Sequence, residues 1–140
     1  MRHFRLEELV DKETFKQRGE EAWQLFTSDA LIMLDDLREF FNTPITVNNW
    51  HSGGPFQFRG YRPPTYKPGV TPGSYHRKGM AFDCDVAGHT AFECRKMIVA
   101  AAKVDNPLVA KINRVEGDVN WLHIDCGKVP NGRRIYVFQA

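Results

Sequence analysis

The chain lacks the features that would place it in a membrane or mark it for secretion. None of its apolar runs reaches the length of a membrane span. Residues 1–8 lack the apolar core of a signal peptide. We therefore expect a protein that is made in the cytoplasm and that reaches any outer target only after release, by lysis or by another route that needs no signal.

Cysteine and net charge are also scarce. Cys84, Cys94 and Cys126 cannot all pair within the chain, and their spacing matches no thiolate zinc motif, so we expect them to be small buried residues. The formal net charge of +2 is mixed in sign along the chain. Binding of nucleic acid usually needs a clustered basic face, so we expect no nucleic-acid partner. A mildly basic surface would suit an anionic polymer such as a cell wall.

Helical periodicity is present in three places. Residues 5–27 are predicted to be helical, in one piece or in two pieces that break near Gly19. A second helix, capped by Ser28 or Asp29, runs to about Asn42. A capping-box pattern at Thr90 and Glu93 opens a third helix that runs to about Lys103. The expected inward-facing residues are Leu31, Ile32, Leu34, Leu37, Phe40 and Phe41 in the second helix, and Phe92, Met97, Ile98 and Ala101 in the third.

Five segments are predicted to be strands: 45–48, 80–86, 109–116, 119–125 and 134–139. The turn at residues 117–118 suits a hairpin, which would pair Glu116 with Val119 and Arg114 with Trp121. His123 would then lie on the same face as Glu116, because directly paired side chains share a face. Residues 49–73 form a long stretch rich in glycine, proline and aromatic residues, which we interpret as an ordered loop that frames a site.

Three residues in this arrangement are candidate metal ligands. His76 and Asp83 lie seven positions apart, and Gly79 lets the chain turn between them. His123 arrives from a neighbouring strand. Two imidazoles and one carboxylate can bind zinc and leave a fourth position open for water, as in catalytic zinc sites. Either Asp85 or Asp125 could hold a ligand imidazole through its second nitrogen.

Zinc lowers the pKa of a bound water and polarises a carbonyl group, so hydrolysis of a peptide would also need a base. Glu116 is the best candidate, because it is expected on the face of His123. Asp118 is the alternative if the hairpin is longer. Arg62 or Arg59, in the long loop, could anchor a substrate carboxylate, for which arginine is well suited by its bidentate geometry; both could equally be solvated loop charges.

The pattern Ser-x-His-x-x-Gly-x-Ala-x-Asp, followed by Trp-x-His, resembles the zinc D-Ala-D-Ala carboxypeptidase and L-alanyl-D-glutamate peptidase family. This family belongs to the LAS metallopeptidases, a group that includes the hedgehog fold. The segment Gly60-Tyr61-Arg62 resembles the family's substrate-binding arginine segment. The matching positions of the pattern are Ser74, His76, Gly79, Ala81, Asp83, Trp121 and His123.

The resemblance implies a small α+β fold with helices on one side of a central antiparallel sheet that carries the zinc. It implies one peptidase domain over residues 1–140, with a helical part at 1–43 and a zinc-binding core at 44–140. Ser74 and Trp121 would lie on the substrate side. Relatives cleave bonds next to D-amino acids in peptidoglycan stem peptides, and bacteriophage lysis enzymes are the most similar in size. We expect a monomer of this type.

One position departs from the family pattern. Several relatives carry an acidic residue three positions before the last histidine ligand, where this chain has Asn120. Other relatives place a glutamate farther upstream, which Glu116 matches. Asn120 keeps a second hypothesis open, a non-catalytic, zinc-stabilised module that binds a cell wall or a protein. The choice between carboxypeptidase and endopeptidase also stays open.

Overall fold

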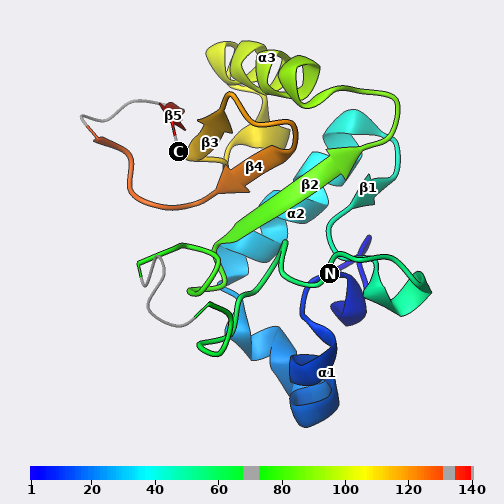
Figure 1. The fold of residues 1–140 in the computed structure, drawn as a ribbon. Coiled ribbons are helices and arrows are strands. Elements are labelled where there is room, and N and C mark those ends of the chain that lie inside the picture. Colours follow the sequence, from blue (N-terminus) through cyan, green and yellow to red (C-terminus); the bar gives the residue numbers. More distant parts are fainter. Residues whose placement is uncertain (68–72, 131–134, 140) are drawn as a thin grey trace.

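The structure, a computed structural model, describes residues 1–67, 73–130 and 135–139 and has an α+β fold (Figure 1). Within these residues it contains three α-helices and a five-stranded sheet of order β1-β2-β4-β3-β5. The helices are α1 (Lys12–Arg18), α2 (Ser28–Phe41) and α3 (Ala91–Lys103). The strands are β1 (Ile45–Thr46), β2 (Ala81–Val86), β3 (Arg114–Gly117), β4 (Leu122–Asp125) and β5 (Tyr136–Gln139).

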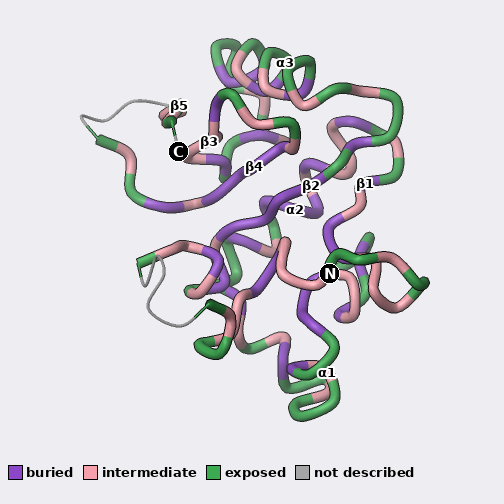
Figure 2. Tube along the Cα trace, in the orientation of Figure 1, coloured by how far each residue is buried: buried purple, intermediate pink, exposed green. Residues whose placement is uncertain are grey.

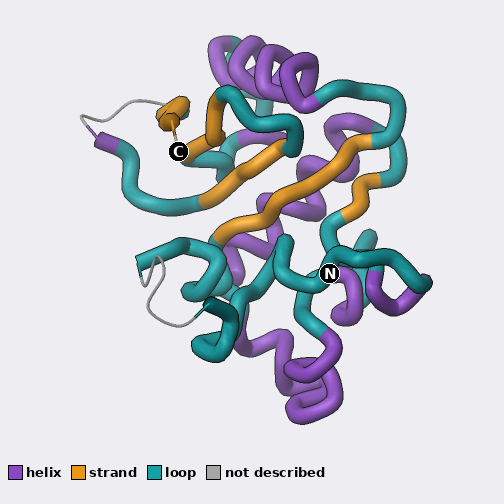
Figure 3. The backbone as a smooth tube through the Cα atoms, in the orientation of Figure 1, coloured by secondary structure: helices purple, strands orange, loops and turns teal. Residues whose placement is uncertain are grey.

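Short 3-10 helices at Leu6–Glu8, Gly19–Leu25, Trp50–Ser52 and Pro107–Val109 connect these elements (Figure 3). Neighbouring strands of the sheet are antiparallel except β3 and β5, which are parallel. The predicted α+β class is confirmed, although the sheet is mixed. The predicted strand at 134–139 appears as β5, and Arg134 lies outside the described residues. So do residues 68–72 of the predicted loop.

The two faces of the sheet differ in character. Phe82 of β2 and Leu122 and Ile124 of β4 are buried in one core with the inner sides of α2 and α3, and Figure 2 shows this buried path through the sheet. The opposite face carries Asp83 and His123. Because side chains alternate along a strand, each of these strands supplies the core with every second residue and the polar face with the others.

The helix predictions were partly wrong in detail. The N-cap of α2 is Thr27, whose hydroxyl accepts a hydrogen bond from the Ala30 amide at 3.2 Å, and not Ser28 or Asp29. The break near Gly19 is confirmed, because α1 ends at Arg18 and Gly19 has a positive φ of 54°. In α2, Ile32 is 45% exposed, and Met33 is buried in its place.

The capping box at the start of α3 is confirmed, since Thr90 and Glu93 exchange hydrogen bonds of 2.9 and 3.1 Å. The predicted inner stripe was wrong at Phe92 and Met97, which are 63% and 38% exposed. The buried stripe consists of Cys94, Ile98, Ala101 and Ala102. These positions recur with helical spacing, and three of the four side chains are small. The prediction from apolarity alone failed because it chose the large residues Phe92 and Met97, which face outward.

The register of the predicted hairpin was also wrong. Residues 107–109 form a 3-10 helix, and β3 begins only at Arg114, which pairs with Asp125 and not with Trp121. Asp118, with φ of 58°, lies in a connection longer than the expected two-residue turn. The observed register differs from the predicted one by an even number of residues. Glu116 and His123 therefore still project from the same face, as expected.

The N-terminal segment packs directly against the backbone of the site loops. Gly60 and Gly79 lie so close to the carbonyl oxygens of Leu9 and Leu25 that a Cβ at either glycine would collide with the main chain. The Tyr61 amide donates to the Leu9 carbonyl at 2.9 Å, and the Thr27 amide donates to the Gly79 carbonyl at 3.2 Å. Gly79 also has a positive φ of 68°, which favours glycine.

Two further sequence expectations concern the whole chain. All three cysteines are free; Cys84 and Cys94 are buried and Cys126 is partly buried. In the described part of the chain, no helix combines the length and the apolarity needed to span a bilayer.

The glycine contacts predict a difference between two substitutions. Gly53→Ala should lower the free energy of unfolding by about 1–2 kcal/mol, because Gly53 is in the left-handed region and a Cβ there meets nothing within 4 Å. Gly79→Ala should cost this amount and a further ~1–3 kcal/mol for overpacking against Leu25. Urea unfolding of both variants and of the wild type measures the difference. Equal losses for the two variants would contradict the proposed close packing.

Candidate metal centre

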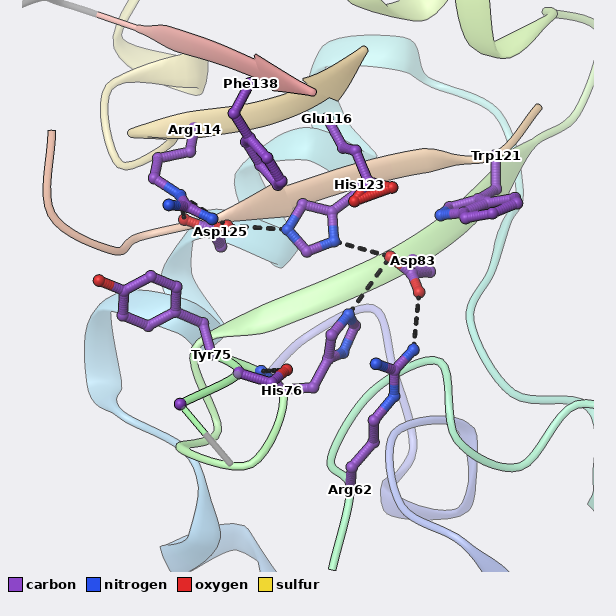
Figure 4. A pocket seen from close by; sticks show the side chains of 12 residues that line it. Arg62, Tyr75, His76, Asp83, Arg114, Glu116, Trp121, His123, Asp125 and Phe138 are labelled. Atoms are coloured by element: carbon purple, nitrogen blue, oxygen red, sulfur yellow. Dashed lines mark hydrogen bonds and ion pairs between the residues drawn. The ribbon is translucent and has the colours of Figure 1, made fainter. Parts of the chain in front are cut away.

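His76, Asp83 and His123 form a buried group that could hold a metal ion. One potential ligand atom from each residue lies within 4.8 Å of the others. Asp83 on β2 pairs directly with His123 on β4. Its Oδ1 atom lies 2.8 Å from Nδ1 of His123 and 3.3 Å from Nε2 of His76 (Figure 4). The three side chains therefore converge on one point of the polar sheet face.

The turn before β2 sets the orientation of His76. Its Nδ1 atom lies 2.9 Å from the carbonyl oxygen of Gly60. Because a carbonyl oxygen only accepts hydrogen bonds, this nitrogen carries the hydrogen. Nε2, which lies 3.3 Å from Asp83 Oδ1, is then the nitrogen of His76 that is available to a metal ion. Gly60 itself is fixed against Leu9, so the orientation of His76 depends on the N-terminal segment.

Asp125 holds His123 from the other side. Its Oδ2 atom lies 2.8 Å from Nε2 of His123, and the carboxylate also accepts hydrogen bonds from Arg114 Nε, at 3.0 and 3.1 Å, and from the Gly127 amide, at 2.9 Å. Asp125 is fully buried. Of the two carboxylates that could support a ligand imidazole, the structure places Asp125 on His123, whereas Asp85 binds Arg59.

The electrostatics of the metal-free group follow from burial and these hydrogen bonds. Burial alone would raise the pKa of Asp83, but hydrogen bonds from His123 and His76 outweigh it and hold this pKa well below its usual range. Burial alone would lower the pKa of His123, but hydrogen bonds with Asp125 and Asp83 raise it to about 9. A metal ion would replace the proton on His123 Nδ1, so metal uptake releases a proton.

The donor set suits a divalent metal of the first transition row. It combines two imidazole nitrogens with one carboxylate oxygen, which is a common set for zinc and its neighbours. The second nitrogen of each ring is engaged by Gly60 or Asp125, as metal-ligating histidines usually are. The residues therefore fit a divalent metal ion.

The group lines a pocket of about 600 Å³. Ser74, Arg62 and Trp121 line the same pocket, so the structure brings them beside the His76, Asp83 and His123 group. The Nε1 atom of Trp121 is buried and has no hydrogen-bond partner in the described part of the chain.

Glu116 also lines this pocket. The pairs Arg114–Asp125 and Val115–Ile124 define the register of β3 against β4. Continuing this register by one residue places Glu116 across from His123, and Figure 4 shows both side chains on the same face. Asp118 instead lines a separate groove beside α3.

The two loop arginines occupy different places. Arg62 donates from Nε to the Phe58 carbonyl at 2.8 Å and from Nη2 to Asp83 Oδ2 at 3.2 Å. Arg59 makes a two-pronged contact with Asp85, at 2.8 and 3.2 Å, and its guanidinium stacks 4.3 Å from the Phe56 ring centroid. The charge of Arg59 is therefore already matched outside the main pocket.

Sequence reasoning assigned no role to three pocket residues, Arg114, Tyr75 and Phe138. Arg114 was expected on the face of His123, so its position could have been used. Tyr75 precedes the candidate ligand His76 in the sequence, but the direction of its side chain depends on the conformation of the turn before β2. Phe138 reaches the pocket only because β5 pairs in parallel with β3, a long-range pairing that carries no local signal.

Comparison with protein-family models, curated proteins and solved structures finds no match for the chain. The chain is an α+β protein with a buried His-Asp-His group that could bind a metal ion in an open pocket.

The geometry predicts that the wild type takes up one divalent ion and that His123→Ala does not. Bound metal should stabilise the folded state by about 2.7 kcal/mol when free metal is a hundredfold above Kd. Metal content after dialysis and thermal unfolding with and without a chelator measure both effects, for zinc, cobalt, manganese and calcium in turn.

His3→Ala is the matched control for this measurement. His3 lies on the surface, 3.4 Å from Glu39, and its loss should leave metal uptake unchanged. Metal uptake by His123→Ala equal to that of the wild type would show that this group does not bind the ion.

Proposed function

We propose that the protein is a zinc-dependent peptidase that cleaves peptide bonds next to D-amino acids in peptidoglycan stem peptides. The observation that carries this proposal is the shared pocket of Glu116 and the His76, Asp83 and His123 group. A candidate base beside a three-ligand centre is the arrangement that metal-assisted hydrolysis needs. The pattern from Ser74 to Asp83, followed by Trp121-x-His123, supports the substrate class by its resemblance to the LAS metallopeptidases.

Zinc is the metal we propose. Catalytic zinc sites use three protein ligands of nitrogen and oxygen type and keep one position open. When bound, zinc polarises the substrate carbonyl and lowers the pKa of water. His76 and His123 would hold it through Nε2 and Nδ1, and Asp83 through a carboxylate oxygen.

The chain's own residues would carry the proton transfers and the positioning. Glu116 accepts a proton from the attacking water and returns it to the leaving amine as the peptide bond breaks. Arg62 stays on Asp83 and orients this ligand at the pocket edge. Trp121 offers an apolar ring to the peptide, and Ser74 lines the same pocket. Arg59 is paired with Asp85 outside this pocket and makes no contact with the peptide in this proposal.

The cellular setting of this proposal follows from the same resemblance. We propose that the protein acts as a monomer on the cell wall after release, in the manner of bacteriophage lysis enzymes or virion-borne wall hydrolases. Its mildly basic composition, with a formal net charge of +2, would favour approach to an anionic wall polymer.

A second candidate function is a zinc-stabilised binding module for a wall or a protein partner. Asn120 favours it, because this residue cannot act as a base where several relatives carry an acid. Asn120 is exposed and does not line the pocket of the metal group. We therefore expect it to have little influence on catalysis.

The test is hydrolysis of purified peptidoglycan by the zinc-loaded protein. Glu116→Gln should lower the rate of release of new amino groups about 10²- to 10⁴-fold, because it removes the proton acceptor. Its zinc content should equal that of the wild type, because Glu116 is not a ligand. Mass spectrometry of the released muropeptides identifies the bond that is cut.

Asp118→Asn separates the two candidate bases. It should keep the wild-type rate, since Asp118 lies in a different groove from the metal group. A loss of rate in Asp118→Asn but not in Glu116→Gln would reverse the assignment. A zinc-loaded wild type that binds the wall and releases nothing would favour the binding module.

A further inference from the structure

The guanidinium group of Arg114 is only partly engaged by the protein. Arg114 lines the pocket of the metal group, and its Nε donates to both oxygens of Asp125. Arginine has five N–H donors in a planar fork. Among residues 1–67, 73–130 and 135–139, no hydrogen-bond partner is found for its two Nη groups. That end of the fork is available to a ligand.

Two aromatic rings fix this guanidinium in place. Its central carbon lies 4.9 Å from the ring centroid of Tyr75 and 4.1 Å from that of Phe138. Tyr75 is itself held, because its hydroxyl accepts a hydrogen bond from the Lys128 amide at 3.2 Å and its ring packs where a side chain on Gly127 would lie. A donor that is already ordered loses little entropy when it binds a ligand.

The other arginines near the centre have less to offer. Arg59 already makes a two-pronged contact with Asp85. Arg62 donates from Nε to the Phe58 carbonyl and from Nη2 to Asp83. The charged residues that line the pocket are two arginines and the carboxylates of Asp83, Glu116 and Asp125. With the His123 proton counted, these charges balance, and a divalent ion that replaces this proton would make the pocket net positive, which suits an anionic ligand.

We propose, as a refinement that rests on the proposed peptidase function, that Arg114 binds the free C-terminal carboxylate of the substrate. Arg114 is separated from the His123 ring by a single hydrogen-bonded carboxylate, that of Asp125. In a substrate cut at its last peptide bond, one extended residue of about 3.3–3.6 Å separates the scissile bond from the terminal carboxylate. With that carboxylate on Arg114, we therefore expect the last peptide bond to lie at the metal group. Tyr75 and Phe138 flank this end of the pocket. The protein is then a carboxypeptidase.

The chemistry of this step is ordinary hydrolysis. Water adds to the carbonyl carbon of the last peptide bond, and the carbon–nitrogen bond breaks. The water proton passes through Glu116 to the departing amine. The products are the shortened peptide and one free amino acid, whose carboxylate stays on Arg114 until it is released. Arg114 determines specificity and takes no part in bond breaking.

The experiment measures equilibrium binding with the zinc-loaded Glu116→Gln protein, which retains the pocket but not the base. The probes are an acylated peptide that ends in D-alanyl-D-alanine with a free carboxylate and the same peptide with a C-terminal amide. We expect the acid to bind roughly 10- to 100-fold more tightly than the amide, as for a hydrogen-bonded charge pair. Adding Arg114→Gln should abolish this ratio.

Arg2→Gln is the matched control, since Arg2 pairs with Glu39 on the surface, and it should keep the ratio. Should Arg114→Gln fail to fold, Arg114→Lys keeps the cation without the planar fork, and the acid-to-amide ratio with Arg114 in place needs no variant at position 114. A purely structural role for Arg114 would lower the affinity for both probes equally.

Equal affinity for acid and amide, no binding of either, or a ratio that survives Arg114→Gln would each overturn the proposal for Arg114. The proposed function fails by a different observation, a zinc-loaded wild type that hydrolyses no peptidoglycan bond. Hydrolysis of internal cross-links without preference for a free carboxylate would keep the peptidase and reject the anchor.

Discussion

One buried carboxylate constrains the whole site. Asp83 has little contact with solvent, and an ionised group in such a place is costly unless it is paired and hydrogen-bonded. Its Oδ1 atom faces His123 and His76, and its Oδ2 atom faces Arg62. The strands, the turn and the loop that supply these partners must all be in place together. Correct folding and assembly of the site therefore depend on each other through Asp83.

The N-terminal segment supports the site although it contributes no ligand. Leu9 and Leu25 press their backbone carbonyls against Gly60 and Gly79, and these two glycines bracket the loop and turn that carry Arg62 and His76. Interiors are close-packed, so such contacts transmit position as well as stability. The N-terminal helical part, to which the sequence assigned no chemical role, therefore holds His76 in position.

Much of this arrangement could be predicted from the sequence because the signals were local. The capping box at Thr90 and the glycine between His76 and Asp83 each depend on a few neighbouring residues. The face shared by Glu116 and His123 was also predicted correctly, because the observed register differs from the predicted one by an even number of residues. The register of β3 and the reach of Phe138 were not predictable, because they depend on a longer connection and on a parallel pairing between distant segments.

The two kinds of support imply an order of events when the site opens. Asp83 and His123 are direct neighbours in the pairing of β2 with β4. Core strands of this kind are usually among the last parts of a small protein to open and exchange their amide hydrogens. His76 depends on a turn clamped by the first third of the chain. A fluctuation that detaches this segment would free the His76 imidazole while the strand pair stays closed. If a metal ion is bound, it would then dissociate stepwise, through a species held by Asp83 and His123 alone.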